Sequence, residues 1–147
     1  MYVVVVGSRN WQDEESTALV NSVLDQLYQK YSGLVIVSSS CDQGVGCIVK
    51  SRCLRDKKTF QMVEYQVKLF VDLPRSKLAQ VHKARNAALE ELGEVFHVFV
   101  DDDRRGTFED LIERLERSGR GDLTHIHFKK KKDKKEDLPN SPSEVAL

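Results

Sequence analysis

The sequence has few cysteines, and none of them are paired at a spacing that suits metal binding. Cys41, Cys47 and Cys53 are odd in number and lie six residues apart. No two of them form the Cys-x-x-Cys pair of a zinc or redox site, and an odd number does not suit a disulfide framework. We therefore expect small buried thiols in a reducing compartment.

Long apolar runs are also absent. No stretch approaches the roughly 20 apolar residues of a membrane span. The apolar start at residues 2–6 lacks the basic segment that opens a signal peptide. We expect a cytoplasmic protein with no membrane partner.

The chain has no excess of charge of one sign. Lys and Arg together number 23, and so do Asp and Glu. Six of the lysines lie within residues 129–135, so residues 1–128 are net acidic. Without a global basic field, nucleic acid is a disfavoured partner.

What the sequence does contain is an alternation of apolar strands and amphipathic helices. Its 147 residues, of which 40% are hydrophobic, fit one domain with a real core. Apolar runs predict strands at residues 2–6, 34–37, 62–73, 95–100 and 123–128. Helical spacing predicts helices at residues 13–31, 47–56, 75–92 and 107–118. The strict alternation predicts an α/β fold, with a parallel five-stranded sheet covered by helices on both faces.

We place the domain at residues 1–128 and expect a disordered tail at residues 129–147. The tail is rich in lysine, contains two prolines and has low hydrophobicity. Parallel sheets bind ligands beyond the carboxyl ends of their strands, where the strand order reverses. The informative residues are therefore those that follow strands.

The first such turn is Gly7-Ser8-Arg9-Asn10-Trp11. Gly7 permits close approach of a ligand or of backbone. Ser8 and Asn10 are able to cap the following helix or to donate to a phosphate, Arg9 to pair with an anion, and Trp11 to stack on a base. The alternative is an ordinary turn in which Trp11 packs at the edge of the domain and Asn10 caps the helix.

The second turn, residues 38–46, is rich in small residues and precedes a helix. Its candidate ligand-binding residues are Ser39, Ser40 and Gly44. Orphan N–H groups at a helix start attract anions. The alternative is a flexible surface loop.

The third turn begins with Asp101-Asp102-Asp103, but consecutive side chains at a strand end point in different directions. We therefore expect no metal site. Arg104 and Arg105 beside Gly106 favour an anion over a metal ion. Thr107 and Asp110 fit a capping box, a structural role that needs no ligand.

Three groups of polar residues have simpler interpretations. On helix geometry alone, we interpret Arg85 and Asn86 as solvent-facing residues of the third helix. His97 lies in an apolar strand, and we interpret it as a core histidine whose ring nitrogens have hydrogen-bond partners. The spacing of Arg114, Arg117 and Arg120 indicates a solvated helix face.

Four motifs in order resemble the SLOG superfamily. They are GSRNW after the first strand, a small-residue loop after the second, ARN in the helix after the third and RRGTFED after the fourth. This superfamily includes the Lonely Guy phosphoribohydrolases, the DNA-processing protein A family and small bacterial and phage proteins of the YspA type, which GSRNW resembles most. The resemblance covers about residues 2–128 and implies a Rossmann-like fold that binds nucleotides or nucleotide-derived molecules.

The resemblance also implies roles for residues. Arg85 matches a helix arginine, and Asp110, with Glu109 adjacent, falls where the phosphoribohydrolases carry a catalytic glutamate for N-glycosidic bond cleavage. Gly106 and Thr107 match a phosphate-binding Gly-Thr. The departures are Asp103-Arg104-Arg105 in place of Pro-Gly-Gly, Ser39 and Ser40 in place of two glycines, and Gly46 in place of an Asp.

Three functions follow from this pattern. We favour a sensor or sequestering protein for a nucleotide-like molecule, because the binding turns persist while the catalytic signature is imperfect. The alternatives are a phosphoribohydrolase or N-glycosidase, with Arg85, Asp110 and Glu109 as catalytic residues, and a single-stranded DNA-binding protein. We expect no cofactor and, by resemblance, a homo-oligomer.

Overall fold

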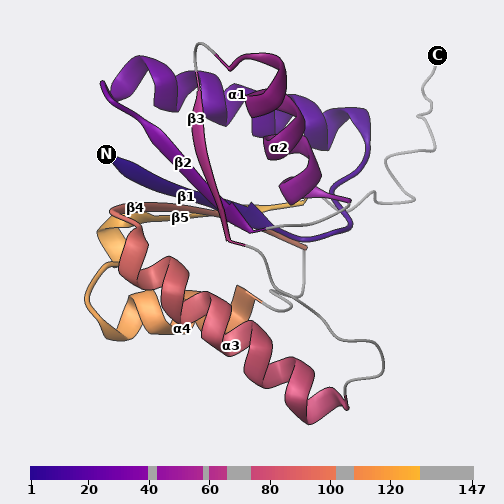
Figure 1. Cartoon of the computed structure of the whole chain (residues 1–147), viewed down its shortest axis with the longest axis vertical. Coiled ribbons are helices and arrows are strands. Elements are labelled where there is room, and N and C mark those ends of the chain that lie inside the picture. The colour runs from indigo at the N-terminus through magenta and orange to yellow at the C-terminus, as the bar shows by residue number, and fades with distance from the viewer. Residues whose placement is uncertain (40–42, 58–59, 66–73, 102–107, 130–147) are drawn as a thin grey trace, which may run out of the picture.

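The computed structural model describes residues 1–39, 43–57, 60–65, 74–101 and 108–129, and its elements alternate as predicted (Figure 1). The strands are β1 (Tyr2–Gly7), β2 (Val35–Ser39), β3 (Gln61–Tyr65), β4 (Val95–Val100) and β5 (Thr124–Phe128). The helices are α1 (Glu14–Lys30), α2 (Val45–Arg55), α3 (Arg75–Leu92) and α4 (Glu109–Arg117), with a short 3-10 helix η2 (Gly121–Leu123) before β5.

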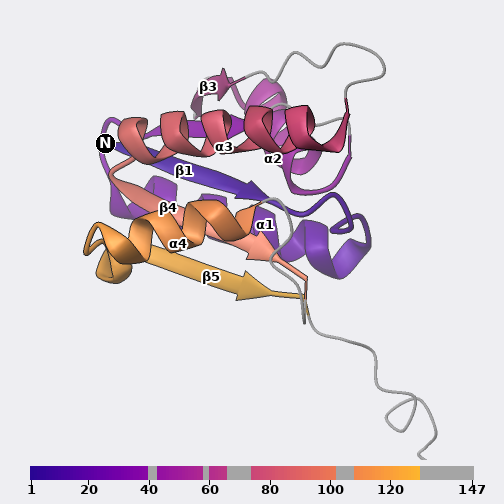
Figure 2. The same ribbon diagram turned by 90° about the horizontal axis from the view of Figure 1, so that it is seen from below.

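The five strands form one parallel sheet in the order β3-β2-β1-β4-β5. Helices α1 and α2 cover one face, and α3 and α4 cover the other (Figures 1 and 2). The prediction of a Rossmann-like three-layer α/β sandwich is therefore confirmed. The strand order reverses between β1 and β4, since the chain moves from β1 outward to β3 and then returns to the other side of β1.

Strand β1 is covered by helices on both faces, which accounts for the continuous apolar run at the start of the chain. Val3 and Val5 point into the core beneath α1 and α2, whereas Val4 and Val6 point into the core beneath α3 and α4. All four side chains are completely buried. A strand that is covered on both faces requires apolar residues at every position.

The predicted element boundaries agree with the structure to different degrees. The bounds of α3 and β4 are as predicted. Helix α2 begins two residues early because Gly44, with φ of 76°, serves as its N-cap. The prediction that the last strand begins at residue 123 was wrong, since Leu123 ends η2. Residues 66–73, which we placed in the third strand, lie outside the described residues.

Two further predictions concern the cysteines and the membrane. Cys53 is buried and Cys47 half-buried, and both are free thiols. Burial raises the pKa of the Cys53 thiol to about 11. Cys41 lies outside the described residues. Among the described helices, none is both long and apolar enough to cross a bilayer.

Candidate functional site

The switch in strand order brings the carboxyl ends of β1 and β4 side by side. Gly7, the last residue of β1, pairs in register with Phe99. A Cβ at Gly7 would lie 2.5 Å from the carbonyl oxygen of Phe99 and 2.8 Å from a methyl group of Val45. Gly7 therefore lets β1, β4 and the start of α2 approach one another closely.

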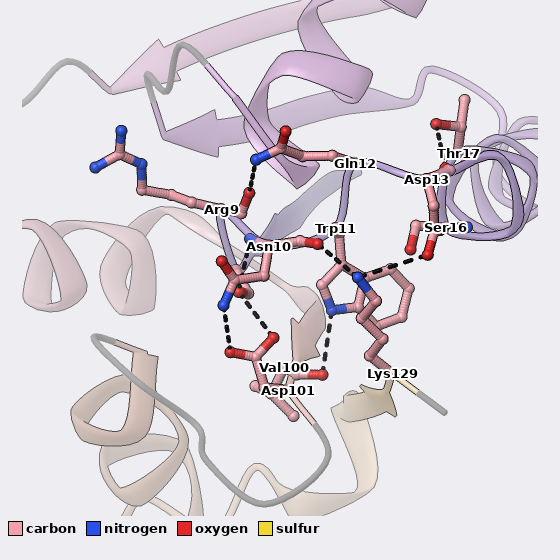
Figure 3. Close-up of polar contacts among 11 residues, drawn as sticks. Arg9, Asn10, Trp11, Gln12, Asp13, Ser16, Thr17, Val100, Asp101 and Lys129 are labelled. Atoms are coloured by element: carbon pink, nitrogen blue, oxygen red, sulfur yellow. Dashed lines mark hydrogen bonds and ion pairs between the residues drawn. The ribbon is translucent and has the colours of Figure 1, made fainter. Parts of the chain in front are cut away.

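The β1–α1 loop is tied to the end of β4 through one carboxylate (Figure 3). The hydroxyl of Ser8 donates to Oδ1 of Asp101 at 3.0 Å, and the amide of Asn10 donates to Oδ2 at 3.0 Å. The hydroxyl of Ser8 also accepts a hydrogen bond from the backbone N–H of Asn10. Ser8 and Asn10 thus hold the Asp101 carboxylate at the switch point.

Asn10 does not cap α1, so that part of the ordinary-turn alternative is wrong. The N-cap is Asp13, whose carboxylate accepts from the backbone N–H of Ser16 at 2.7 Å. The hydrogen bonds with Ser16 lower the pKa of Asp13. Since Asp13 performs the capping, the side chain of Asn10 is available to reach β4.

Trp11 is a core residue, and the interpretation that it stacks on a base is wrong. Only 1% of the residue is exposed, so the indole offers no open face to a ligand. Its Nε1 donates to the carbonyl oxygen of Val100 at 3.2 Å, and its ring packs edge-on against Phe99. Trp11 therefore anchors the loop to β4.

Whereas Trp11 points into the core, Arg9 lies at the surface of the domain. Its side chain is exposed and extends away from the Asp101 carboxylate (Figure 3). The side-chain amide of Gln12 donates to the backbone carbonyl of Arg9 at 2.8 Å, which fixes the backbone of the loop. Arg9 remains a candidate for pairing with an anion at the mouth of the site.

Lys129, the residue that follows β5, contacts the same β1–α1 loop. Its Nζ donates to the carbonyl oxygen of Asn10 at 2.6 Å and lies 3.6 Å from a carboxylate oxygen of Asp13 (Figure 3). Its backbone N–H donates to the carbonyl oxygen of Val100. Lys129, which we assigned to the tail, is therefore held by the domain.

The second loop packs directly on the first. Gly44 has φ of 76° and ψ of −149°, and a Cβ there would overlap Cα of Arg9 and the carbonyl oxygen of Ser8. The backbone N–H of Val45 donates to that same carbonyl of Ser8. Ser39 is buried at the end of β2. Gly44 is thus required by loop packing, whether or not a ligand approaches it.

Arg85 and Asn86 are buried, so the interpretation that they face solvent is wrong. Arg85 is 6% exposed and Asn86 is completely buried. Two nitrogens of the guanidinium donate to Oδ1 of Asn86 at 3.2 and 3.1 Å. The guanidinium carbon lies 4.2 Å from the ring centre of Phe108, the residue that precedes α4. Stacking and hydrogen bonding together restrict the orientation of the Arg85 fork.

Asp110 joins this network from α4. The amide of Asn86 donates to Oδ2 of Asp110 at 3.4 Å, and Nε of Arg114 donates to the same oxygen at 2.8 Å. Burial alone would raise the pKa of Asp110, but the hydrogen bonds from Arg114 and Asn86 outweigh burial and lower it. Glu109, at the first position of α4, is half-buried. Asp110 is consequently ionised at neutral pH.

The arginine face of α4 is only partly solvated. Arg117 is exposed, as predicted. Arg114 lies 3.6 Å from Glu90 of α3, and Arg120 donates to the backbone carbonyl of Glu90 at 2.6 Å. For Arg114 and Arg120 the prediction was wrong, because both join α4 and its C-terminal turn to α3.

The imidazole of His97 has a hydrogen-bond partner, as the sequence indicated. Its Nδ1 lies 2.9 Å from Nε2 of His127 on β5, and its ring stacks on His125. His97 lies between Phe96 and Val98, which point into the core beneath α3 and α4, so its side chain lies on the opposite face of the sheet. Arg85 and Asp110 belong to α3 and α4 themselves. The structure therefore keeps this histidine apart from the candidate site.

The remaining candidate residues lie outside the described part of the chain. They are Ser40, Arg105, Gly106 and Thr107, and Asp102 and Asp103 lie outside it as well. Among the residues that the structure does describe, no group of three or more His, Cys, Asp or Glu is arranged to hold a metal ion. The described part of the site is therefore one of arginine, asparagine and carboxylate side chains.

Comparison of the chain with protein-family models, with curated proteins and with solved structures gave no match. The resemblance to the SLOG superfamily accordingly rests on the four motifs alone and stays a prediction. The structure adds Phe108 and Asp101 to the site. Both lie in the third turn or the motif that follows it, but the sequence pattern predicted a binding role for neither. Asp101 is the first residue after β4, which is the position where a parallel sheet presents functional side chains.

Proposed function

We propose that the protein binds a nucleotide or nucleotide-derived small molecule at the carboxyl ends of β1 and β4, as a sensor or sequestering protein. The observation that carries this proposal is the buried, oriented guanidinium of Arg85 beside the first turn of α4. An arginine fork matches the oxygens of a phosphate through paired hydrogen bonds. Because Asn86 and Phe108 fix the fork in advance, less conformational entropy is lost when an anion binds.

The surroundings of Arg85 support an anionic ligand. Helix α4 starts beside the guanidinium, and the N-terminal end of a helix attracts negative charge. Helix α2 starts against the loop that carries Ser8 and Arg9. The two helix starts therefore flank the point at which the strand order reverses, where open parallel sheets bind ligands.

A second candidate function is hydrolysis of an N-glycosidic bond, as in a phosphoribohydrolase. It is favoured by the link through Asn86, which connects Arg85 to the ionised carboxylate of Asp110. An ionised carboxylate is suited to stabilise the positive charge that develops on the sugar in glycoside hydrolysis. It is not suited to act as a general acid, so in this scheme Asp110 would act only through its charge.

A thermal-shift screen tests both functions. The purified protein is mixed with nucleoside mono-, di- and triphosphates, cyclic nucleotides and ADP-ribose derivatives, and each mixture is then separated by chromatography. A ligand at a hundredfold excess over its Kd stabilises the protein by about 2.7 kcal/mol. We expect a shift with intact ligand, whereas a shift with released free base would identify the hydrolase.

The matched variants are Arg85→Lys and Arg117→Lys. Both keep the positive charge and remove the fork, but Arg117 is exposed on α4. We expect Arg85→Lys to abolish the shift and Arg117→Lys to preserve it. A screen without any shift, or equal shifts in wild type and Arg85→Lys, would overturn the proposal.

A further inference from the structure

One face of α3 carries a stripe of residues that is polar at one end and apolar at the other; Arg85, Asn86 and Leu89 are buried in it, and His82 is half-buried. His82, Arg85, Asn86 and Leu89 recur at helical spacing, so they share this face. Helix α3 runs from the carboxyl edge of the sheet toward the amino edge (Figure 2). His82 therefore lies one turn closer than Arg85 to the carboxyl edge, where a ligand of a parallel sheet binds.

The imidazole of His82 has a buried atom whose hydrogen-bonding capacity is unused. Within the described part of the chain, Nδ1 of His82 is buried and has no hydrogen-bond partner. Native proteins leave few buried polar atoms in this state, because each one costs folding free energy. Such an atom next to a candidate binding residue suggests that the protein retains it for a ligand.

The charge state of His82 is defined by its surroundings. Burial lowers the pKa of His82, and the positive charge of Arg85 lowers it further. The ring is therefore neutral at pH 7, with one nitrogen that donates and one that accepts. A neutral imidazole in the positive field of Arg85 is compatible with an anion that contacts both side chains.

We propose that His82 is a second phosphate-binding residue, whose Nδ1–H donates to one oxygen of a phosphate monoester while the fork of Arg85 binds the others. A terminal phosphate has three oxygens. Nε and one Nη group of Arg85 donate to Asn86 in the ligand-free protein, so the phosphate would be bound along the edge formed by the two Nη groups, which is able to contact two of its oxygens. The imidazole, one helical turn away on the same face, supplies the third contact. The ligand class is then a nucleotide with a terminal phosphate, rather than a nucleoside or a free base. This inference rests on the proposed function.

The first test measures the free protein. His82→Leu removes the unpaired nitrogen and keeps a side chain of similar bulk. If Nδ1 is retained for a ligand, the melting temperature of the ligand-free variant stays equal to that of wild type or rises. A drop of more than about 5 °C would show that His82 has a structural role and would overturn the inference.

The second test measures affinity for AMP, GMP, CMP and UMP and for the four matching nucleosides by calorimetry. A hydrogen bond to a charged group corresponds to a loss of about 10- to 100-fold in affinity when it is removed. We expect His82→Leu to weaken monophosphate binding by that factor and to leave nucleoside binding unchanged. His82→Asn, whose amide N–H lies close to the position of Nδ1, should retain most of the affinity.

The control is His125→Leu, the same substitution at an exposed histidine of β5. It should leave every affinity unchanged. If wild type binds monophosphates and Arg85→Lys weakens them, but His82→Leu does not, the inference on His82 fails and the proposed function stands. If wild type binds none of the eight compounds and no other nucleotide in the thermal-shift screen, both fail.

Discussion

Gly44 and Gly33 share a backbone conformation with positive φ but differ in what surrounds them. Gly33 has φ of 66°, and apart from its chain neighbours no atom lies within 4 Å of the position of a Cβ. At Gly44 that position is filled by backbone atoms of Ser8 and Arg9. With φ of 76° and ψ of −149°, Gly44 also lies in a region that only glycine commonly adopts.

We therefore predict unequal costs for the two alanine substitutions. Gly33→Ala should lower the free energy of unfolding by about 1 kcal/mol, the cost of a left-handed conformation for a residue with a Cβ. Gly44→Ala should cost at least about 3 kcal/mol, since rigid backbone has to move as well. Urea unfolding of both variants measures the difference, and similar losses would show that the two loops do not pack as described.

At the residue scale, the sequence indicated which residues of the first turn are important better than it indicated which residues contact them. It identified Ser8, Asn10 and Trp11 as the informative residues of the first turn. Their partners Asp101 and Val100 lie about 90 positions away, and no local pattern shows that the two segments meet. The role of Trp11 could not be decided for this reason.

At the element scale, a short chain of charges adds to the apolar packing of α3 against α4. Arg114 of α4 pairs with Asp110 on its own helix and approaches Glu90 of α3. The arginine side chain is 29% exposed, so solvent screens these pairs in part. The interaction is therefore expected to be measurable but small.

We predict that Arg114→Gln lowers the free energy of unfolding by about 1 kcal/mol at pH 7, and that Arg117→Gln changes it by less than half of that. Because the pKa of Asp110 is lowered on folding, its contribution is present above the unfolded value of about 3.9. It is lost as the pH falls through the folded pKa. Urea titrations at pH 7 and pH 3 should therefore show a larger difference between wild type and Arg114→Gln at pH 7 than at pH 3.

Strands β4 and β5 carry a second pH-dependent contact. Burial, with smaller contributions from the charges of His125 and His127, lowers the pKa of His97 to about 3, and burial also lowers that of His127. The unfolded chain, with a histidine pKa of about 6.5, binds more protons below that pH than the folded chain does. The stabilisation is complete above pH 6.5 and declines as the pH falls.

We predict that the free energy of unfolding decreases from pH 7 to pH 5, with a slope of at most about 1.4 kcal/mol per pH unit for each histidine. His97→Phe should flatten this slope, because the most strongly shifted imidazole is removed. His125→Gln, at an exposed position, should keep most of the slope. An unchanged slope in His97→Phe would contradict the assignment of His97 as a neutral, half-buried ring.

Still at the element scale, the periodicity of the sequence predicted the helices and strands that apolar residues form. It did not predict which polar side chains are buried. The parallel sheet and the bounds of α3 and β4 followed from apolar runs and helical spacing. Arg85 and Asn86 were misplaced because a buried polar stripe has the same sequence signature as a solvent-facing one. Only the packing of α3 against α4 distinguishes the two, and that packing is a tertiary contact.

At the scale of the whole molecule, the balance of charge limits the partners. Lys and Arg equal Asp and Glu at 23 each, and five lysines follow Lys129 within residues 130–135. Affinity for single-stranded DNA depends on neutralising phosphates, and it declines steeply with salt. Any DNA binding by this chain should therefore depend on residues 130–147 rather than on the domain.

We predict that the full chain binds a 20-nucleotide single strand weakly at about 150 mM salt, with a Kd no tighter than about 10 µM, which is in the range of non-specific binding. Binding at lower salt should disappear in the chain truncated after Lys129, which retains the contacts of Lys129 with Asn10 and Asp13. Fluorescence anisotropy of a labelled oligonucleotide measures both. Tight binding that resists salt and survives the truncation would place the DNA contact on the domain itself. It would then favour the single-stranded DNA-binding alternative over a nucleotide-binding protein.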